Sequence, residues 1–180
     1  VSWLGSRGPY EEVYLPQRDA GRLLAFYSCS GPVRALDPYS YHRLQAWEAF
    51  RYGAIYQAFW AFGDTGGGSA WNEYSAPGTC YSPQFLDASG NTTSKHMEAI
   101  REGLYDYEYL VLLRKAVEQA EKSGRNPAAV RQARQLLTTL PAKVVDAEGA
   151  QAIDWHAPKQ RDVADNARKE VLKALEALSQ

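Results

Sequence analysis

Cysteine, histidine and net charge are all scarce in this 180-residue sequence, and each scarcity excludes a class of protein. Two cysteines, Cys29 and Cys80, are too few for a disulfide-dense scaffold or a four-cysteine zinc site, although the two could pair with each other. The three histidines lie in separate segments without metal-ligand spacing, so we expect no metal. Because 20 Lys+Arg balance 21 Asp+Glu, the chain lacks the basic surface of a nucleic-acid-binding protein.

Long apolar runs and nucleotide-binding loops are also missing. No stretch approaches the roughly 20 apolar residues of a membrane-spanning helix, so we expect no membrane partner. The run GGGS at 66–69 lacks the lysine and the helix start of a phosphate-binding loop, and we expect no cofactor. The sequence begins Val-Ser-Trp, with neither Met nor a basic-then-apolar leader, which suggests a processed product or a fragment.

What the sequence does contain is distributed unevenly. Of its 22 aromatic residues, 21 lie in residues 1–109, as do 12 of the 14 glycines. The remaining 71 residues hold 21 of the 41 charged side chains. This contrast indicates an aromatic, loop-rich part followed by a charged, helical part.

The first part reads as a strand–helix–strand unit. Residues 22–29 and 54–61 are short apolar runs bounded by glycine, as expected of strands buried on both faces. Between them, residues 40–52 carry apolar side chains at helical spacing. Such an order favours parallel strands and a right-handed crossover. A short strand at 1–4 and the end of a helix at 16–21 precede the unit.

A long loop and three helices are expected to follow. Residues 63–93 contain several Gly and Pro turn signals, and a structureless loop of this length is usually functional. A helix begins near Ser94 and ends at Gly124. Asn126-Pro127 then starts another, which should end before Pro141. A final helix covers about 158–178.

Ligands of parallel α/β sheets bind beyond the carboxyl ends of the strands. Aromatic, acidic and amide side chains gather in the sequence at those ends and in the loop that follows. The rings suit the CH faces of sugars and the carboxylates suit hydroxyls, although the same rings could equally form an aromatic core. For Trp60 and Trp71 the loop context favours contact with a ligand over burial in a core. The candidate binding residues there are Tyr27, Trp60, Asp64, Trp71, Glu73 and Tyr81.

Two further patterns concern the helices. Arg43, four residues before Trp47, could position a strand-end carboxylate and is counted with the candidate binding residues, or could form a salt bridge while Trp47 docks the helix. In the run REGLYDYEYL at 101–110, Gly103 costs a helix roughly 1 kcal/mol relative to Ala and is tolerated where something packs closely against it. We read Arg101 and Asp106 as a buried polar tie that holds this helix in place.

Residues 96–113, HMEAIREGLYDYEYLVLL, resemble the signature REG-x-x-DYEYL-x-LL near the C-terminus of glycoside hydrolase family 123-like catalytic domains. The preceding motifs agree in order: FYSC at 26–29, Arg43-x-x-x-Trp47, Trp60, WNEY at 71–74 and YSP at 81–83. The likeness covers roughly residues 1–115.

The resemblance implies an α/β fold: a partial (β/α)₈ TIM barrel in residues 1–124, made of its last strands and helices, and a helical extension in 125–180. A complete barrel typically needs about 250 residues. It also implies a carbohydrate partner, an amino-sugar glycoside or glycan, and a missing N-terminal part of the parent barrel. The parent would be a secreted protein, extracellular or periplasmic.

The resemblance implies the activity of that family, whose characterised members look like retaining β-N-acetylgalactosaminidases. These enzymes use substrate-assisted hydrolysis, and an adjacent Asp-Glu pair supplies their catalytic residues. This chain contains no Asp-Glu dipeptide, so the catalytic residues would lie upstream of Val1. The chain would then supply the wall of a sugar subsite and be inactive alone. The alternatives are a non-catalytic carbohydrate-binding protein and a helical interaction protein using residues 126–180.

Overall fold

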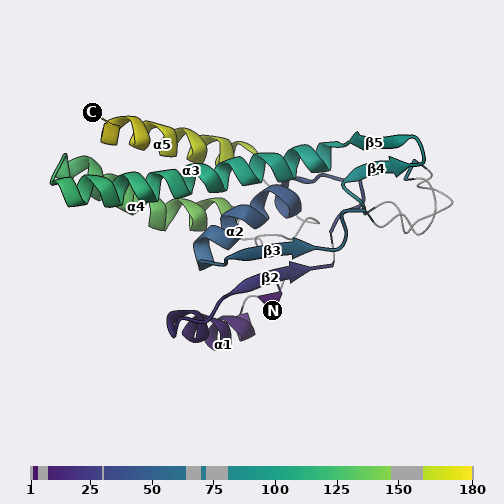
Figure 1. The fold of residues 1–180 in the computed structure, drawn as a ribbon, viewed down its shortest axis with the longest axis horizontal. Coiled ribbons are helices and arrows are strands. Elements are labelled where there is room, and N and C mark those ends of the chain that lie inside the picture. The colour runs from purple at the N-terminus through teal and green to yellow at the C-terminus, as the bar shows by residue number, and fades with distance from the viewer. Residues whose placement is uncertain are drawn as a thin grey trace.

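The computed structural model describes residues 2–3, 8–29, 31–63, 70–71, 81–146 and 160–179. Helices make up 63% of the described residues. In Figure 1 the long helix α3 lies above a small sheet, α2 lies between α3 and the strands, and α1 lies below the strands. The described residues therefore form a helical assembly with a small parallel sheet along its side and a separate two-stranded sheet.

The small sheet is parallel and has the strand order β1-β2-β3. The elements that build it are β1 (Ser2–Trp3), α1 (Gly8–Asp19), β2 (Ala25–Ser28), the short π-helix η1 (Tyr39–Arg43), α2 (Leu44–Tyr52) and β3 (Tyr56–Phe59). In β2, Phe26 and Ser28 are buried while Tyr27 is exposed, so one face of the sheet is covered and the other is open. The predicted strand–helix–strand unit with parallel strands is confirmed.

The segment expected to be a structureless loop contains a hairpin. Strands β4 (Gln84–Asp87) and β5 (Gly90–Thr93) pair antiparallel, with Asp87 opposite Gly90. The Asp87 carboxylate closes the turn, since its Oδ1 accepts hydrogen bonds from the backbone N–H groups of Ser89 at 2.7 Å and Gly90 at 3.2 Å. Gly90 has a φ of 148°, which a residue with a side chain rarely adopts.

Three long helices follow the hairpin in the described residues: α3 (Lys95–Ser123), α4 (Pro127–Val145) and α5 (Asp162–Ser179). The predicted starts are confirmed, because Ser94 caps α3 through the His96 N–H and Asn126 caps α4 through the Ala129 N–H. The expected end of α4 before Pro141 is wrong. The helix continues through Pro141 because the residues beyond it, Val144 and Val145, are fully buried and hold the last turn in place.

The expected partial (β/α)₈ barrel followed by a helical extension is also wrong. No barrel is closed, and the parallel strands of the described chain are three, each two to four residues long. A single buried cluster instead joins Leu44 of α2, Leu110 of α3, Leu140 of α4 and Val171 of α5. The strand–helix–strand unit is present, but the barrel around it was implied only by the resemblance. The apolar faces of α4 and α5 instead pack into the same core as α2.

Candidate functional site

The carboxyl ends of β2 and β3 bring two of the candidate residues to one edge of the sheet. Tyr27 lies opposite Ala58 in the β2–β3 register. Trp60 directly follows β3, and its backbone N–H donates to the Ser28 carbonyl at 2.8 Å. Tyr27 is 37% exposed and Trp60 is 58% exposed. Both residues are therefore accessible to solvent, as is Tyr56, which the β2–β3 register places on the same face of the sheet as Tyr27.

Trp71 lies against the hairpin. Its indole stacks on the ring of Phe85 in β4, with ring centroids 4.1 Å apart and an angle of 11° between the planes, and it remains 54% exposed. The Ala70 N–H, one residue earlier, donates to the Leu86 carbonyl at 2.9 Å, which joins this segment to the hairpin backbone. One face of the Trp71 ring is thus supported by protein while much of the residue stays accessible.

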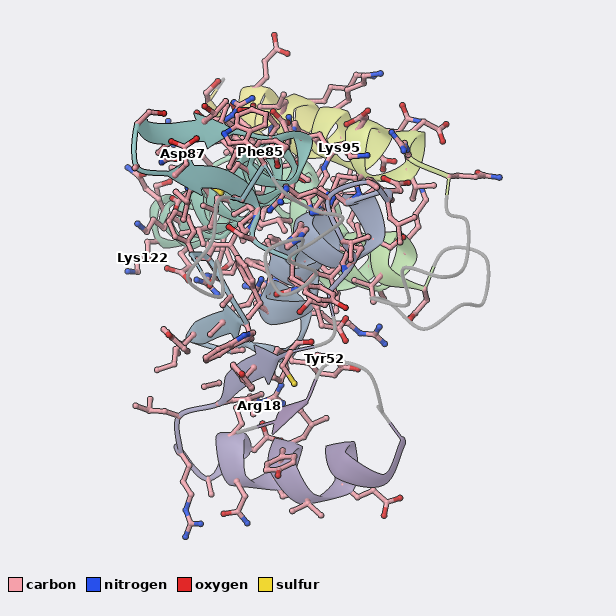
Figure 2. All side chains as sticks on the ribbon, turned by 90° about the vertical axis from the view of Figure 1, so that its right-hand side faces the viewer. Arg18, Tyr52, Phe85, Asp87, Lys95 and Lys122 are labelled. Carbon is pink, nitrogen blue, oxygen red and sulfur yellow. The ribbon has the colours of Figure 1, made fainter. Side chains whose placement is uncertain are left out.

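A carboxylate accompanies this aromatic pair. Asp87 lies two residues after Phe85 in β4, and Figure 2 shows both on the hairpin, at the opposite end of the molecule from α1. Hydrogen bonds from the hydroxyl and the backbone N–H of Ser89 hold the pKa of Asp87 below its ordinary value, and Trp71 adds a weaker hydrogen bond. Asp87 therefore carries a negative charge beside the exposed indole at neutral pH.

Arg34, in the loop after β2, connects these parts. Its Nη1 donates to the carbonyl of Ser82 at 2.7 Å, and its Nη2 donates to the carbonyl of Ala70 at 2.6 Å. Its guanidinium also lies 4.5 Å from the centroid of the Phe85 ring. Arg34 is only 4% exposed. A buried cation thus holds the backbone next to Trp71 and the ring beneath it.

Ser82 links the hairpin to the strand ends. Its hydroxyl donates to the Phe62 carbonyl, two residues after Trp60, at 2.6 Å. Neighbouring Tyr81 is 46% exposed. The carboxylates Asp64 and Glu73, predicted as partners of these rings, lie outside the described residues.

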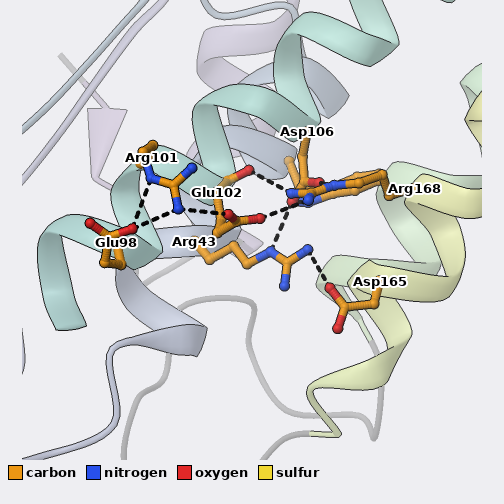
Figure 3. Close-up of polar contacts among 8 residues, drawn as sticks. Arg43, Glu98, Arg101, Glu102, Asp106, Asp165 and Arg168 are labelled. Carbon is orange, nitrogen blue, oxygen red and sulfur yellow. Dashed lines mark hydrogen bonds and ion pairs between the residues drawn. The ribbon is translucent and has the colours of Figure 1, made fainter.

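The structure places Arg43 among the helices. Its Nε donates to Asp106 Oδ2 at 2.9 Å, and its Nη2 lies 2.8 Å from Asp165 Oδ1 of α5 (Figure 3). Arg43 is 8% exposed. Of the two roles predicted for it, the structure displays the salt bridge that accompanies the docking of Trp47, whose indole N–H donates to Asp106 Oδ2 at 2.9 Å.

Asp106 is the centre of this network. Besides Arg43 and Trp47, it accepts a hydrogen bond from Arg168 Nε of α5 at 2.5 Å, and its side chain is completely buried. The prediction of a buried polar tie is confirmed for Asp106. It is wrong for Arg101, whose side chain is 48% exposed and pairs with Glu98 on the surface of α3 at 2.6 Å. The tie holds together η1, α2, α3 and α5.

Two histidines are buried beside each other. The rings of His42 and His96 lie 4.9 Å apart, and within the described chain neither ring nitrogen of His42 has a hydrogen-bond partner. Burial lowers the pKa of His42 to about 3 and that of His96 to about 4, so both rings are neutral at pH 7. Among the described residues, no three His, Cys, Asp or Glu side chains are placed to hold a metal ion together. Both histidines are packing residues.

Sequence reasoning did not find Arg34, Phe85 and Asp87. Arg34 follows Gly31-Pro32 in the loop after a predicted strand, which is where ligand-facing residues of parallel sheets gather, and that position was the available signal. Phe85 and Asp87 were hidden because their segment was expected to be structureless. Cys29 is an exposed free thiol at the end of β2, and Cys80 lies outside the described residues.

Comparisons with known proteins assign no family to the chain. No protein-family model matches it, and no curated protein sequence matches it either. Within the described segments, no helix combines the length and apolar character that crossing a membrane requires.

Proposed function

We propose that this chain binds a carbohydrate through the exposed aromatic residues at its strand ends and hairpin. The observation that carries the proposal is a contrast among its tryptophans: Trp47 is 1% exposed, whereas Trp60 and Trp71 are each more than half exposed. Large aromatic rings stabilise a fold by being buried, so two such rings kept at the surface support a ligand-binding role. The proposed binding residues also include Tyr27 and Tyr81, whose side chains are exposed as well.

The geometry suits sugars better than nucleotides and other phosphate-bearing ligands. The Trp71 ring is supported on one side by Phe85 and flanked by the ionised Asp87, which can accept hydrogen bonds from hydroxyl groups. That negative charge beside the ring repels nucleotides and other phosphate-bearing ligands. A neutral, hydroxyl-rich ligand with one apolar face satisfies both groups.

The resemblance to glycoside hydrolase family 123-like domains makes an N-acetyl-β-galactosaminide the ligand to test first. Under this proposal the chain contributes sugar contacts to a glycosidase, and the Asp-Glu pair that such an enzyme needs does not occur in it. The isolated chain therefore binds the glycoside without cleaving it. Turnover of 4-nitrophenyl N-acetyl-β-D-galactosaminide by the purified chain would contradict the proposal that this chain binds the glycoside without cleaving it.

The binding test uses isothermal titration calorimetry with methyl N-acetyl-β-D-galactosaminide. Trp60→Ala and Trp71→Ala should each weaken binding at least tenfold, which corresponds to about 1.4 kcal/mol. The matched control is Tyr105→Ala, which removes an aromatic residue that is 47% exposed on α3 and should leave affinity unchanged. Absence of binding to the unsubstituted chain, or equal loss in all three variants, would refute the proposal.

A further inference from the structure

We propose that Arg34 is a positioning residue that holds the Trp71 indole in place as a pre-formed platform for the apolar face of a sugar. The identity of the ligand rests on the proposed function, but the positioning itself follows from contacts within the chain. Arg34 does not present its own donors to the ligand, since only 4% of the residue is exposed. It acts through the backbone and the ring that support Trp71.

The first part of the argument is the backbone. Trp71 follows Ala70 directly, and Arg34 Nη2 donates to the Ala70 carbonyl at 2.6 Å. Arg34 Nη1 donates to the Ser82 carbonyl at 2.7 Å, just before β4, and lies 3.4 Å from the Gln84 carbonyl. One guanidinium therefore ties the backbone beside Trp71 to the start of the strand against which Trp71 packs.

The second part is the ring beneath the indole. Phe85 contacts both side chains: the Arg34 guanidinium lies 4.5 Å from its centroid, and the Trp71 ring lies 4.1 Å from it. Backbone and ring contacts thus converge on Trp71 from the same buried cation. A ring held in one orientation loses less conformational entropy when a ligand binds, which raises affinity.

The chemistry of the side chain makes the inference specific to arginine. A guanidinium is a planar fork that donates in several fixed directions and stacks on aromatic rings, whereas a lysine ammonium is a compact charge that does neither well. Arg34→Lys keeps the charge but cannot reach two separated carbonyls and cover Phe85 at once. The charge-conserving substitution should therefore release Trp71.

The experiment observes Trp71 directly by fluorine NMR of protein labelled with 5-fluorotryptophan, with its resonance assigned from the Trp71→Phe variant. In Arg34→Lys the Trp71 resonance should move toward that of free 5-fluorotryptophan and show a larger solvent isotope shift in D₂O. Affinity for methyl N-acetyl-β-D-galactosaminide should fall at least tenfold. The other tryptophan resonances, including that of buried Trp47, should stay in place.

Two further variants make the result decisive. Arg18→Lys is the matched control, because Arg18 Nη1 also donates to a backbone carbonyl, that of Tyr52 at 2.8 Å, and this change should leave Trp71 unaffected. Phe85→Leu removes the supporting ring and should move the Trp71 resonance even if Arg34→Lys fails to fold.

A Trp71 resonance that stays in place in a folded Arg34→Lys overturns the inference. If Arg34→Lys does not fold, a resonance that stays in place in Phe85→Leu overturns it. A resonance that moves in a chain that binds no glycoside supports the positioning role and refutes only the proposed ligand.

Discussion

Gly103 of α3 lies directly against the backbone of Arg43: a Cβ at position 103 would come within 2.6 Å of the Arg43 carbonyl oxygen and 3.2 Å of its Cα. The obstacle is backbone, which cannot turn away as a flexible side chain can. This close approach lets α3 contact η1 at the level where Arg43 reaches Asp106.

Gly103→Ala should therefore destabilise the protein. Alanine gains about 1 kcal/mol of helix propensity, but the imposed shift of α3 or η1 costs more, so we expect a net loss of about 1–3 kcal/mol in the free energy of unfolding. Urea denaturation followed by circular dichroism measures it. Gln119→Ala, at an exposed position of the same helix, should stay within about 0.5 kcal/mol of the original. A stabilised Gly103→Ala variant would show that the contact does not constrain the helix.

Asp106→Ala should be among the most damaging substitutions in the chain. It leaves the buried donors of Arg43 and Trp47 without their acceptor, and breaking a buried ion pair typically costs about 3–5 kcal/mol. Glu98→Ala removes an exposed partner of Arg101 and should cost at most about 1 kcal/mol. Thermal denaturation of both variants gives the comparison, and similar losses for the two would contradict the central role of Asp106.

The buried histidines predict how stability depends on pH. Burial lowers the pKa of His42 to about 3 and that of His96 to about 4, whereas the unfolded chain has the ordinary value of about 6.5. Below pH 6.5 the unfolded state takes up protons that the folded state does not, so stability falls as pH falls, by up to about 1.4 kcal/mol per pH unit for each histidine. Well above pH 6.5, where the histidines of the unfolded chain are neutral as well, these groups contribute no pH dependence.

Urea denaturation between pH 6.5 and 5 measures this slope before most carboxylates titrate. His42→Gln, which cannot take up a proton, should reduce the slope by the contribution of one histidine. In the unsubstituted chain, NMR titration should find the His42 and His96 rings neutral throughout this range. A ring of either residue that titrates near pH 6.5 in the folded protein would refute the prediction.

Asn126 combines a helix cap with an unusual backbone conformation. Its φ is 40°, its side chain accepts from the Ala129 N–H at 3.2 Å, and its Nδ2 donates to the Ala177 carbonyl of α5 at 3.2 Å. Asn126→Ala loses both hydrogen bonds and is strained at positive φ, so we expect a loss of about 1–2 kcal/mol. Asn126→Gly adopts this φ freely and should lose less. Equal losses in thermal denaturation would show that the backbone conformation contributes nothing.

The sequence predicted most of the helices because their signals are local. The Ser94 cap, the Gly124 end and the Asn126-Pro127 start each depend on neighbouring residues alone, and each occurs where expected. Pro141 does not end α4 as expected, because the free energy that a proline costs inside a helix is offset by the burial of Val144 and Val145. That burial depends on distant elements. The sequence does not predict the hairpin, because Gly and Pro turn signals in residues 63–93 do not show which segments pair on either side of a turn.

For the candidate site, the sequence predicts Tyr27 and Trp60 at the ends of adjacent parallel strands. The parallel pairing of β2 with β3 confirms this. The loop context favours a ligand-facing ring over a core ring at Trp60 and Trp71, and both are exposed, but the sequence does not separate core rings from surface rings elsewhere. Trp47 and Trp60 are chemically identical, and their exposures of 1% and 58% follow from which helices cover them. Nor could it choose the partner of Arg43, because Asp106 lies 63 residues away along the chain.

By itself the sequence determined the local elements of this protein: helix starts and ends, parallel strands around a helix, and a glycine in α3 that requires a close neighbour. Those depend on backbone preferences and periodicity, which act over a few residues. The tertiary structure decided that α4 and α5 share one core with α2, that Asp106 gathers Arg43, Trp47 and Arg168, and that Arg34 supports Trp71 through Phe85. These are contacts between distant segments, and they form only where packing brings the segments together.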